Sequence, residues 1–368
     1  MKDLPKLKIL MPTPTFFPEM GGIEMHVYQV SRRMVRQGMS VTILTTDRKG
    51  LFPKEEIIEG VRVIRVRALP SDRDWHFAPD LIHVIESGKR QWDLMHLQSY
   101  HTFVAPFVLW GALRAELPYV ITPHSGGHAS KFRNSVRGIH RGVLYPFISR
   151  SKKIITISRF EYELYKKLVP LKRLALIPNG FEPIEDDGSL TDMSIDGNLI
   201  LSVGRLEPNK GHQRIISAMP YIISKRPQVK LRVIGKGSYE DTLRNLVKKL
   251  NLSHCVEIGG IPPDDRNGMA RALRSASVVT LLSDYENHPV AVLEALTMKR
   301  PVLLADNSGL REIARRGWAR SIPTNSKPEE IAKAVLGQLD DPLIPENVDI
   351  FSWDDCTQNI LAVYREVL

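Results

Sequence analysis

With 368 residues, the chain exceeds the ~250–300 residues at which a single hydrophobic core stops growing, so we expect two domains. Its 43% apolar and 25% charged residues exclude a collagen-like or largely disordered protein, and two cysteines are too few for a disulfide framework. No run of about 20 apolar residues occurs, and Pro12 and Pro14 interrupt the short apolar stretch after Lys8, so neither a membrane-spanning helix nor a signal peptide is expected. These features predict a cytoplasmic protein.

The net charge of +10 is concentrated in the first half of the chain. Through Glu185 there are 28 Lys or Arg and 17 Asp or Glu residues, an excess of +11, whereas the remainder has 23 and 24, a balance of −1. A basic first half is expected to meet something anionic, and nucleic acid, an anionic membrane surface and a phosphorylated acceptor all fit.

Short apolar, β-branched runs alternate with helical patterns along the whole chain. For example, a helix is expected at 23–37, where Val27, Val30 and Met34 lie on one stripe and Gly38 is a natural stop. This alternation predicts the α/β class, with parallel sheets covered by helices on both faces. The expected strands are 7–11, 40–46, 61–66, 94–97, 119–122, 154–157 and 174–177 in the first half, and 199–203, 230–234, 256–258, 278–282 and 302–304 in the second.

A break between the halves is visible at 182–189, which is acidic, contains turn-forming residues and has no periodic apolar residues. We therefore predict a first domain at 1–183, a linker at 184–196 and a second domain at 197–350. A final helix is expected at about 353–367, with Ser352 as its N-cap.

The first chemically suggestive motif follows the strand at 199–203. That strand ends at Gly204, and the next loop presents Arg205 and Lys210 just before a helix that starts near His212. Two cations fixed at a strand end suit a diphosphate, because Arg binds phosphate through two hydrogen bonds and Lys adds a point charge. The alternative is a solvated turn with ordinary basic residues.

The second motif surrounds a helix that we expect to have Pro289 in its first turn and Asn287 as its N-cap. This helix is apolar nearly all round and therefore buried, and Glu294 falls on the face of Val290, Leu293 and Thr297. A buried carboxylate needs hydrogen-bond donors, which a ribose diol supplies, although a neighbouring backbone group or Arg is the alternative partner. Glu286 precedes the helix and is placed to accept hydrogen bonds from a sugar. The free N–H groups of Val290 and Ala291 are expected to face phosphates.

Together these motifs resemble the retaining glycosyltransferases of family 4 (glycosyl transferases group 1), in which two glutamates with seven residues between them follow Gly-Arg-(x)₄-Lys. That family has the GT-B architecture, in which two Rossmann-like, doubly wound parallel-sheet domains face a cleft and the last helix, here 353–368, completes the first domain. The resemblance extends along nearly the whole chain. The family's order is also followed by Gly21-Gly22-Ile23-Glu24, Asp93-Leu94-Met95-His96, Ile157-Ser158-Arg159, Ile177-Pro178-Asn179-Gly180, Val233-Ile234-Gly235-Lys236-Gly237 and Asp306-Asn307-Ser308-Gly309-Leu310-Arg311-Glu312.

The resemblance implies a role for each matched residue. Arg205 and Lys210 would hold the donor diphosphate, Glu294 the ribose and Glu286 the hydroxyls of the transferred sugar. His124, at a strand end of the first domain, would face the donor sugar. Donor contacts are also implied for Gly22, Gly204, Val290 and Ala291. One departure is that the family often has Gly-Phe-Gly after its first glutamate, where this chain has Asn287-His288-Pro289; this leaves the donor sugar open.

No metal or other cofactor is expected, because the nucleotide-sugar is a substrate and the site's cations would carry the diphosphate charge. Asp72-Arg73-Asp74 looks like a metal-binding Asp-x-Asp, but it lies in a polar loop beside Pro70 and Ser71, which favours a surface loop. No His/Cys spacing indicates zinc.

The stretch 131–147 interleaves Lys131, Arg133, Arg137 and Arg141 with apolar and aromatic residues. This composition is typical of an interfacial membrane helix, and a solvated face over ordinary core residues is the alternative. We therefore expect a cytoplasmic protein that associates peripherally with an anionic membrane at its inner face.

These observations predict a retaining, metal-independent enzyme that moves a hexose-type sugar from a UDP-, GDP- or ADP-linked donor to an acceptor hydroxyl. The acceptor classes considered are a glycan, a lipid-linked sugar, a polysaccharide and a small molecule. A GT-B sugar-nucleotide epimerase or phosphorylase is the nearer alternative. A nucleic-acid-binding protein is the distant one, because no nucleic-acid motif is present and Glu286 and Glu294 would be unexplained.

Overall fold

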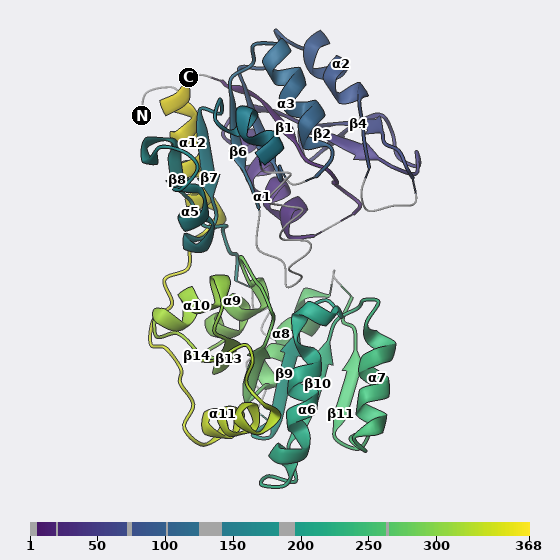
Figure 1. Cartoon of the computed structure of the whole chain (residues 1–368), viewed down its shortest axis with the longest axis vertical. Coiled ribbons are helices and arrows are strands. Elements are labelled where there is room, and N and C mark those ends of the chain that lie inside the picture. Colours follow the sequence, from purple (N-terminus) through teal and green to yellow (C-terminus); the bar gives the residue numbers. More distant parts are fainter. Residues whose placement is uncertain are drawn as a thin grey trace. The chain divides into compact units, whose positions relative to one another are not determined.

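The computed structural model describes residues 6–19, 21–71, 76–100, 102–124, 142–183, 196–262 and 265–368. These residues form two compact units, each with its own sheet and helices (Figure 1). The first unit comprises the described residues up to Gly180 together with Phe351–Leu368, and the second comprises Phe181–Ile350. The chain thus changes unit close to residue 183, and most of the expected linker lies outside the described residues.

The first unit is built on an eight-stranded sheet in the order β3-β4-β2-β1-β5-β6-β7-β8. In this sheet β3 runs antiparallel to β4, and the other neighbours are parallel. The strands are β1 (Lys8–Pro12), β2 (Ser40–Asp47), β3 (Glu55–Ile58), β4 (Val61–Arg67), β5 (Leu94–Gln98), β6 (Tyr119–Thr122), β7 (Lys153–Thr156) and β8 (Leu174–Leu176).

Helices cover both faces of this sheet because successive strand side chains point to opposite sides. Leu10 of β1 lies in one apolar cluster with α2 (Asp80–Ser87) and α3 (Ala105–Arg114). Its neighbour Ile9 lies in the other, with α1 (Gly22–Arg36) and α12 (Trp353–Val367). The structure adds α5 (Arg159–Tyr165) and the 3-10 turn η1 (Leu171–Arg173) after β7.

The C-terminal helix α12 is an integral part of the first unit. Ser352 caps it by accepting a hydrogen bond from the Asp355 N–H, as the sequence predicts. Arg33 Nε of α1 lies 3.1 Å from Asp354 Oδ1, and Tyr364 Oη lies 2.6 Å from Nδ1 of buried His96. The helix start also requires glycine at 180, where a Cβ would lie 2.3 Å from the Trp353 Cα.

The second unit contains a six-stranded sheet in the order β11-β10-β9-β12-β13-β14, with parallel neighbours throughout. Helices α6, α7 and α11 contribute to the apolar cluster on one face, and α8, α9 and α10 to the cluster on the other. The elements are β9 (Leu199–Val203), η2 (Pro208–Lys210), α6 (His212–Ile223), β10 (Lys230–Ile234), α7 (Glu240–Lys249), β11 (Val256–Gly259), α8 (Arg266–Ser275), β12 (Val278–Leu281), α9 (Val290–Thr297), β13 (Val302–Ala305), α10 (Ser308–Arg315), β14 (Arg320–Ile322) and α11 (Pro328–Asp340).

The predicted α/β class with two parallel-sheet units is confirmed. Among the helices that the structure describes, none combines the length and apolar character needed to cross a membrane.

Candidate active site

Glycines allow close contacts between the loops at the carboxyl edge of the second sheet. Gly211 has a φ of +76°, and a Cβ there would lie 2.0 Å from the Leu282 carbonyl oxygen. A Cβ at Gly235 would lie 1.9 Å from the Gly204 carbonyl oxygen. The ends of β9, β10 and β12 therefore approach one another more closely than any side chain allows.

Lys210 and Glu286 form an ion pair at this edge. Lys210 Nζ lies 2.6 Å from Glu286 Oε1, and the two side chains are only 16% and 13% exposed. The Ser283 hydroxyl also donates to Glu286 Oε1, at 2.9 Å. Residues 76 positions apart are thus brought together, so that the predicted phosphate cation and the predicted sugar acceptor share one local network.

The start of α10 holds the loop that carries Glu286. The Glu286 N–H donates to Ser308 Oγ at 2.9 Å, and the Gly309 N–H donates to the Glu286 carbonyl at 2.9 Å. A Cβ at Gly309 would lie 2.6 Å from the Asn287 carbonyl oxygen, so glycine is needed at this contact. The loop is consequently held through both the N–H and the carbonyl of Glu286.

Arg205, the other cation of the motif, has a different environment. Its side chain is 70% exposed, and its Nη1 lies 2.6 Å from Glu207 Oε1. An exposed pair of this kind contributes little to stability. Arg205 is therefore available to a ligand at small cost, whereas Lys210 is already engaged inside the protein.

Glu294 is buried on α9, as the sequence predicts, with 4% of the residue exposed. Its Oε1 accepts a hydrogen bond from Arg266 Nη2 at 2.8 Å. Burial raises the pKa of the Glu294 carboxyl, and the charge and hydrogen bond of Arg266 act in the opposite direction. Of the protein partners considered from sequence, an Arg is the one that the structure places at Glu294.

The start of α9 differs from the prediction, which was wrong to place the N-cap at Asn287. The N-cap is Pro289, which makes no side-chain cap hydrogen bond, and the helix begins at Val290. The reason is that the Asn287 carbonyl packs against Gly309 at the start of α10 instead of opening α9. Val290 is 44% exposed, so the first turn, with the N–H groups of Val290 and Ala291, begins at the surface.

His212 is a site-forming residue to which the sequence analysis assigned no role. It is buried at the start of α6, and burial lowers its pKa to about 4, so the ring is neutral near pH 7. Its Nε2 lies 3.3 Å from the Arg205 carbonyl and must donate there, which leaves Nδ1 to accept from Ser202 Oγ at 2.9 Å. His212 thereby fixes the backbone of the loop that presents Arg205.

In the first unit, His124 follows β6 and has a φ of 47°. Its Nε2 lies 2.8 Å from Gln98 Oε1 at the end of β5, and its ring centroid lies 4.9 Å from that of buried His26. Gly22 is the first residue of α1, and a Cβ there would meet no atom within 4 Å. Both predicted residues therefore lie at the carboxyl edge of the first sheet.

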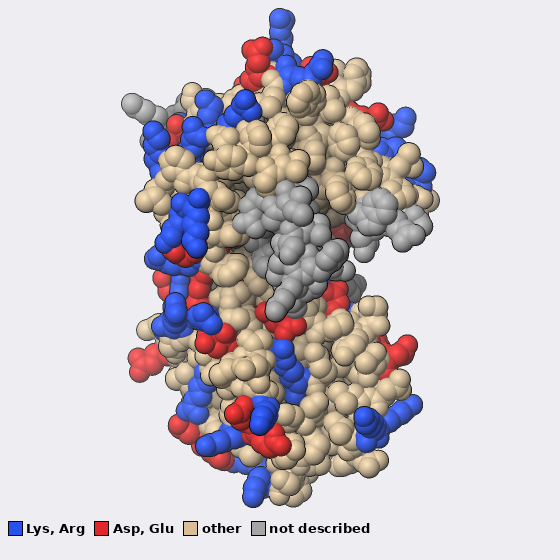
Figure 2. All heavy atoms as spheres, in the orientation of Figure 1, with Lys and Arg blue, Asp and Glu red and all other residues tan. Residues whose placement is uncertain are grey.

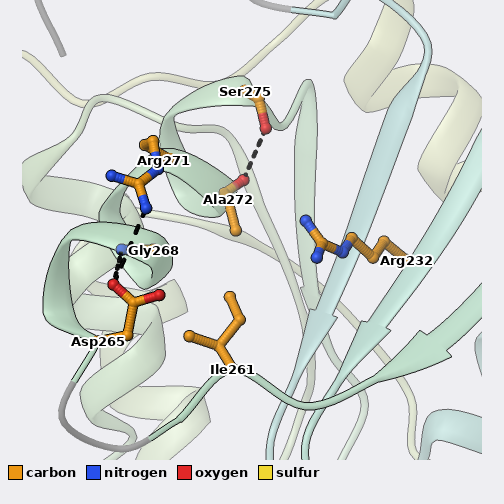
Figure 3. Close-up of a pocket in the computed structure, with 7 residues that line it drawn as sticks. All are labelled: Arg232, Ile261, Asp265, Gly268, Arg271, Ala272 and Ser275. Atoms are coloured by element: carbon orange, nitrogen blue, oxygen red, sulfur yellow. Dashed lines mark hydrogen bonds and ion pairs between the residues drawn. The ribbon is translucent and has the colours of Figure 1, made fainter. Parts of the chain in front are cut away.

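A cavity of about 290 Å³ lies elsewhere in the second unit, beside α8 (Figure 3). None of the predicted site residues lines it. Arg232 enters from β10, and Arg271 and Asp265 come from α8 and its N-cap. The cavity lining is completed by Ile261, Gly268, Ala272 and Ser275.

Within the described part of the chain, no group of three or more His, Cys, Asp or Glu residues is arranged to hold a metal ion. Asp72-Arg73-Asp74 and the basic residues Lys131, Arg133, Arg137 and Arg141 lie outside the described residues.

Two doubly wound α/β units with charged loops at a sheet's carboxyl edge form the class of fold in which ligands bind beyond the carboxyl ends of the strands. The family model "Glycosyltransferase Family 4" matches residues 20–184, and "Glycosyl transferases group 1" matches residues 193–350. Together the two models span most of the chain. The chain belongs to this glycosyltransferase family and is a transferase.

Similar proteins cover its full length. The chain is 27% identical to an uncharacterized glycosyltransferase of Methanocaldococcus jannaschii, with 98% of each chain covered. It is 25% identical to a phosphatidyl-myo-inositol mannosyltransferase of Mycobacterium leprae, with 98% of this chain and 97% of that protein covered.

Solved structures agree on the fold. Sucrose-phosphate synthase from Thermosynechococcus elongatus has a TM-score of 0.77 at 20% identity, with 98% and 99% of the two chains covered. HepE of Anabaena, in complex with UDP-glucose, has a TM-score of 0.76 at 18% identity, with 98% and 100% covered. The GT-B fold expected from the sequence is therefore confirmed.

Proposed function

We propose that this protein is a retaining, metal-independent glycosyltransferase that moves a hexose-type sugar from a nucleotide-sugar to an acceptor hydroxyl. The observation that carries the proposal is the Lys210–Glu286 pair at the carboxyl edge of the second sheet. An ammonium has three donors, so Lys210 can keep Glu286 while binding a phosphate oxygen, and Glu286 retains lone pairs for sugar hydroxyls. One hydrogen-bond network can thereby position the sugar relative to the diphosphate.

The chemistry requires charge stabilisation more than an enzymic nucleophile. As the bond from the anomeric carbon to the phosphate oxygen breaks, its electron pair leaves with the nucleoside diphosphate. The acceptor oxygen bonds to the same face of the sugar and passes its proton to the departing phosphate oxygen, which gives retention. Lys210, Arg205 and the N–H groups of Val290 and Ala291 stabilise the charge on that leaving group.

A melting-temperature screen with UDP-, GDP- and ADP-sugars, followed by product analysis, tests this proposal. We expect one donor class to stabilise the protein through binding and to release the nucleoside diphosphate when an acceptor is supplied. An isomerised donor without transfer, or cleavage that consumes inorganic phosphate, would assign the site to an epimerase or phosphorylase instead.

The acceptor is proposed to be lipid-linked, reached by peripheral docking of the first unit on an anionic membrane. Besides its excess of basic residues, the first unit exposes aromatic side chains among its described residues. Phe103 precedes α3 and Phe107 and Trp110 lie on it, at i, i+4 and i+7, and Phe103 and Trp110 are 42% and 49% exposed. Phe77 extends the stripe, with its ring centroid 5.1 Å from that of Phe103.

Aromatic residues of this kind suit a bilayer interface, and an excess charge of +11 in residues 1–185 suits anionic headgroups. On the face drawn in Figure 2, charged side chains border a broad uncharged area of the first unit. The phosphatidyl-myo-inositol mannosyltransferases among the relatives are named for a lipid acceptor, which supports the same assignment.

Vesicle co-sedimentation tests the docking proposal. Wild-type protein should sediment with anionic but not neutral vesicles at low salt, and added salt should weaken this binding because it screens the attraction between exposed charges. Phe103→Ser with Trp110→Ser should weaken binding at every salt concentration, and a combined Lys131, Arg133, Arg137 and Arg141 to Ser variant should weaken it most at low salt. If the wild type stays in the supernatant with anionic vesicles at low salt, the membrane proposal is wrong.

A further inference from the structure

Arg266 occupies an electrostatically unfavourable place in its helix. It is the first residue of α8, where the helix dipole disfavours a cation, and the first turn of α8 contains no acidic residue. The N-cap role belongs to Asp265, whose Oδ1 accepts the Gly268 N–H at 2.7 Å. Helix capping therefore does not explain an arginine at this position.

The compensating partner of Arg266 is Glu294 on the neighbouring helix. The Nη2–Oε1 distance is 2.8 Å, the Arg266 side chain is 52% exposed and the Glu294 side chain 5%. Glu294 lies one turn after Val290, on the same face of α9, and Val290 begins that helix at the surface. A half-exposed arginine thus contacts a buried carboxylate, which lies one turn after the start of α9 that is proposed to bind phosphate.

Among the described residues of the elements packed against α9, no other charged group duplicates this contact. The strands against α9, β12 and β13, carry no titratable residue. On α8, Arg271 Nη2 lies 3.9 Å from Asp265 Oδ1, and the charge of Arg274 repels that of Arg300. His288 precedes the helix and is neutral near pH 7, because burial lowers its pKa to about 4. The ionisation and orientation of Glu294 thus depend on Arg266 among these neighbours.

The geometry points to Arg266 as a positioning residue that holds Glu294 in the orientation and charge state needed to bind the nucleotide ribose. This inference rests on the proposed function. Arg266 engages Oε1 from the exposed side and need not touch the nucleotide. Its effect on the ligand is exerted through the carboxylate, which distinguishes it from a direct contact residue.

Nucleotide affinity of four variants tests the assignment, measured by calorimetry with the nucleoside diphosphate of the preferred donor. Arg266→Gln should weaken binding about ten-fold, the scale of one hydrogen bond to a charged group. Its donor KM should rise while kcat is retained, and Arg266→Lys should recover most of the affinity. Glu294→Gln should weaken binding, and Arg266→Gln combined with Glu294→Gln should bind no more weakly than Glu294→Gln alone. The matched control is Arg271→Gln, an exposed arginine on the same helix that does not contact Glu294, and it should bind like wild type.

The pH dependence supplies a readout that a purely structural role would not give. Without Arg266, the pKa of Glu294 should rise further, so the nucleotide affinity of Arg266→Gln should fall at a higher pH than that of wild type when the pH is decreased. Additive losses in the double variant, or wild-type affinity in Arg266→Gln, would overturn the inference while the transferase activity stood. If wild type bound no nucleotide, both the inference and the proposed function would fall.

Discussion

The carboxyl edges of the two sheets differ in how they use charge. In the second unit the proposed site consists of ion pairs, Lys210 with Glu286 and Arg266 with Glu294, in which at least one member is largely buried. In the first unit the predicted site residue His124 lies against the Gln98 amide, and Glu24 in the first turn of α1 accepts a hydrogen bond from the Thr15 hydroxyl. We therefore propose that the ion pairs of the second unit serve the diphosphate and that His124 of the first unit serves hydroxyls. The second unit nevertheless has a balanced net charge, so the proposed specialisation is in the position of the charges and not in their number.

The largest expected effect is the loss of activity on removing Lys210. Lys210→Ala should lower kcat/KM by about 10²–10³, the effect of removing one charge-stabilising donor. It should also lower the melting temperature, because Glu286 is left largely buried without its cation. Steady-state kinetics and thermal melting measure both effects.

Arg205→Ala is the matched comparison for that experiment. It should also reduce the rate, but its melting temperature should stay near wild type, because the Arg205–Glu207 pair is exposed. Near wild-type turnover in either variant would remove that residue from the mechanism, and equal destabilisation of both would contradict the contrast between them.

The two glutamates of the proposed site in the second unit are expected to bind different parts of the donor. Glu294→Gln should weaken binding of the bare nucleoside diphosphate by ~1–3 kcal/mol, the range for hydrogen bonds to a charged group. Glu286→Gln should weaken binding of the nucleotide-sugar more than binding of the bare nucleotide. The substitution removes the carboxylate proposed to accept the sugar's hydroxyls and leaves Lys210, its partner, for the phosphate. Calorimetry with both ligands measures the difference. Equal losses for the bare nucleotide would show that the proposed division is wrong.

Much of the fold could be predicted from the sequence, because buried parallel strands are short, apolar and β-branched. The edge strand β3, Glu55–Ile58, was missed because its two glutamates and half-exposed side chains give no such pattern. At the site, local motifs predicted Lys210, Glu286 and Glu294 as candidates but not their partners. Arg266 lies 28 residues from Glu294, and no local pattern connects them.

A smaller kinetic effect is expected for His124 of the first unit. His124→Ala should reduce kcat roughly ten-fold, as for the loss of one hydrogen bond to the donor sugar, and leave affinity for the bare nucleotide unchanged. His83→Ala, which removes an exposed histidine on α2, is the matched control. A loss of bare-nucleotide affinity equal to the loss of kcat would place His124 in a different role.

The smallest expected effect is on stability and concerns His212. Its pKa is lowered from about 6.5 to about 4 in the folded protein, so between these values the unfolded chain binds a proton that the folded chain does not. The stability of the second unit should therefore fall as pH decreases from about 6.5 to about 4, and half-buried His288, whose pKa is also about 4, should add to the fall. His212→Asn should make the melting temperature less dependent on pH over this window, whereas His254→Gln, at an exposed position, should leave the dependence unchanged. An identical pH dependence in His212→Asn would contradict the assignment.

The most direct test of the account is NMR analysis of the transfer product formed in excess EDTA, with the donor identified by the melting screen. The account predicts release of the nucleoside diphosphate and a new glycosidic bond with the same anomeric configuration as the donor, at a rate that EDTA does not change. An inverted bond would contradict retention. Complete loss of activity in EDTA, restored by manganese or magnesium, would contradict the claim that Lys210, Arg205 and the start of α9 carry the charge of the leaving group.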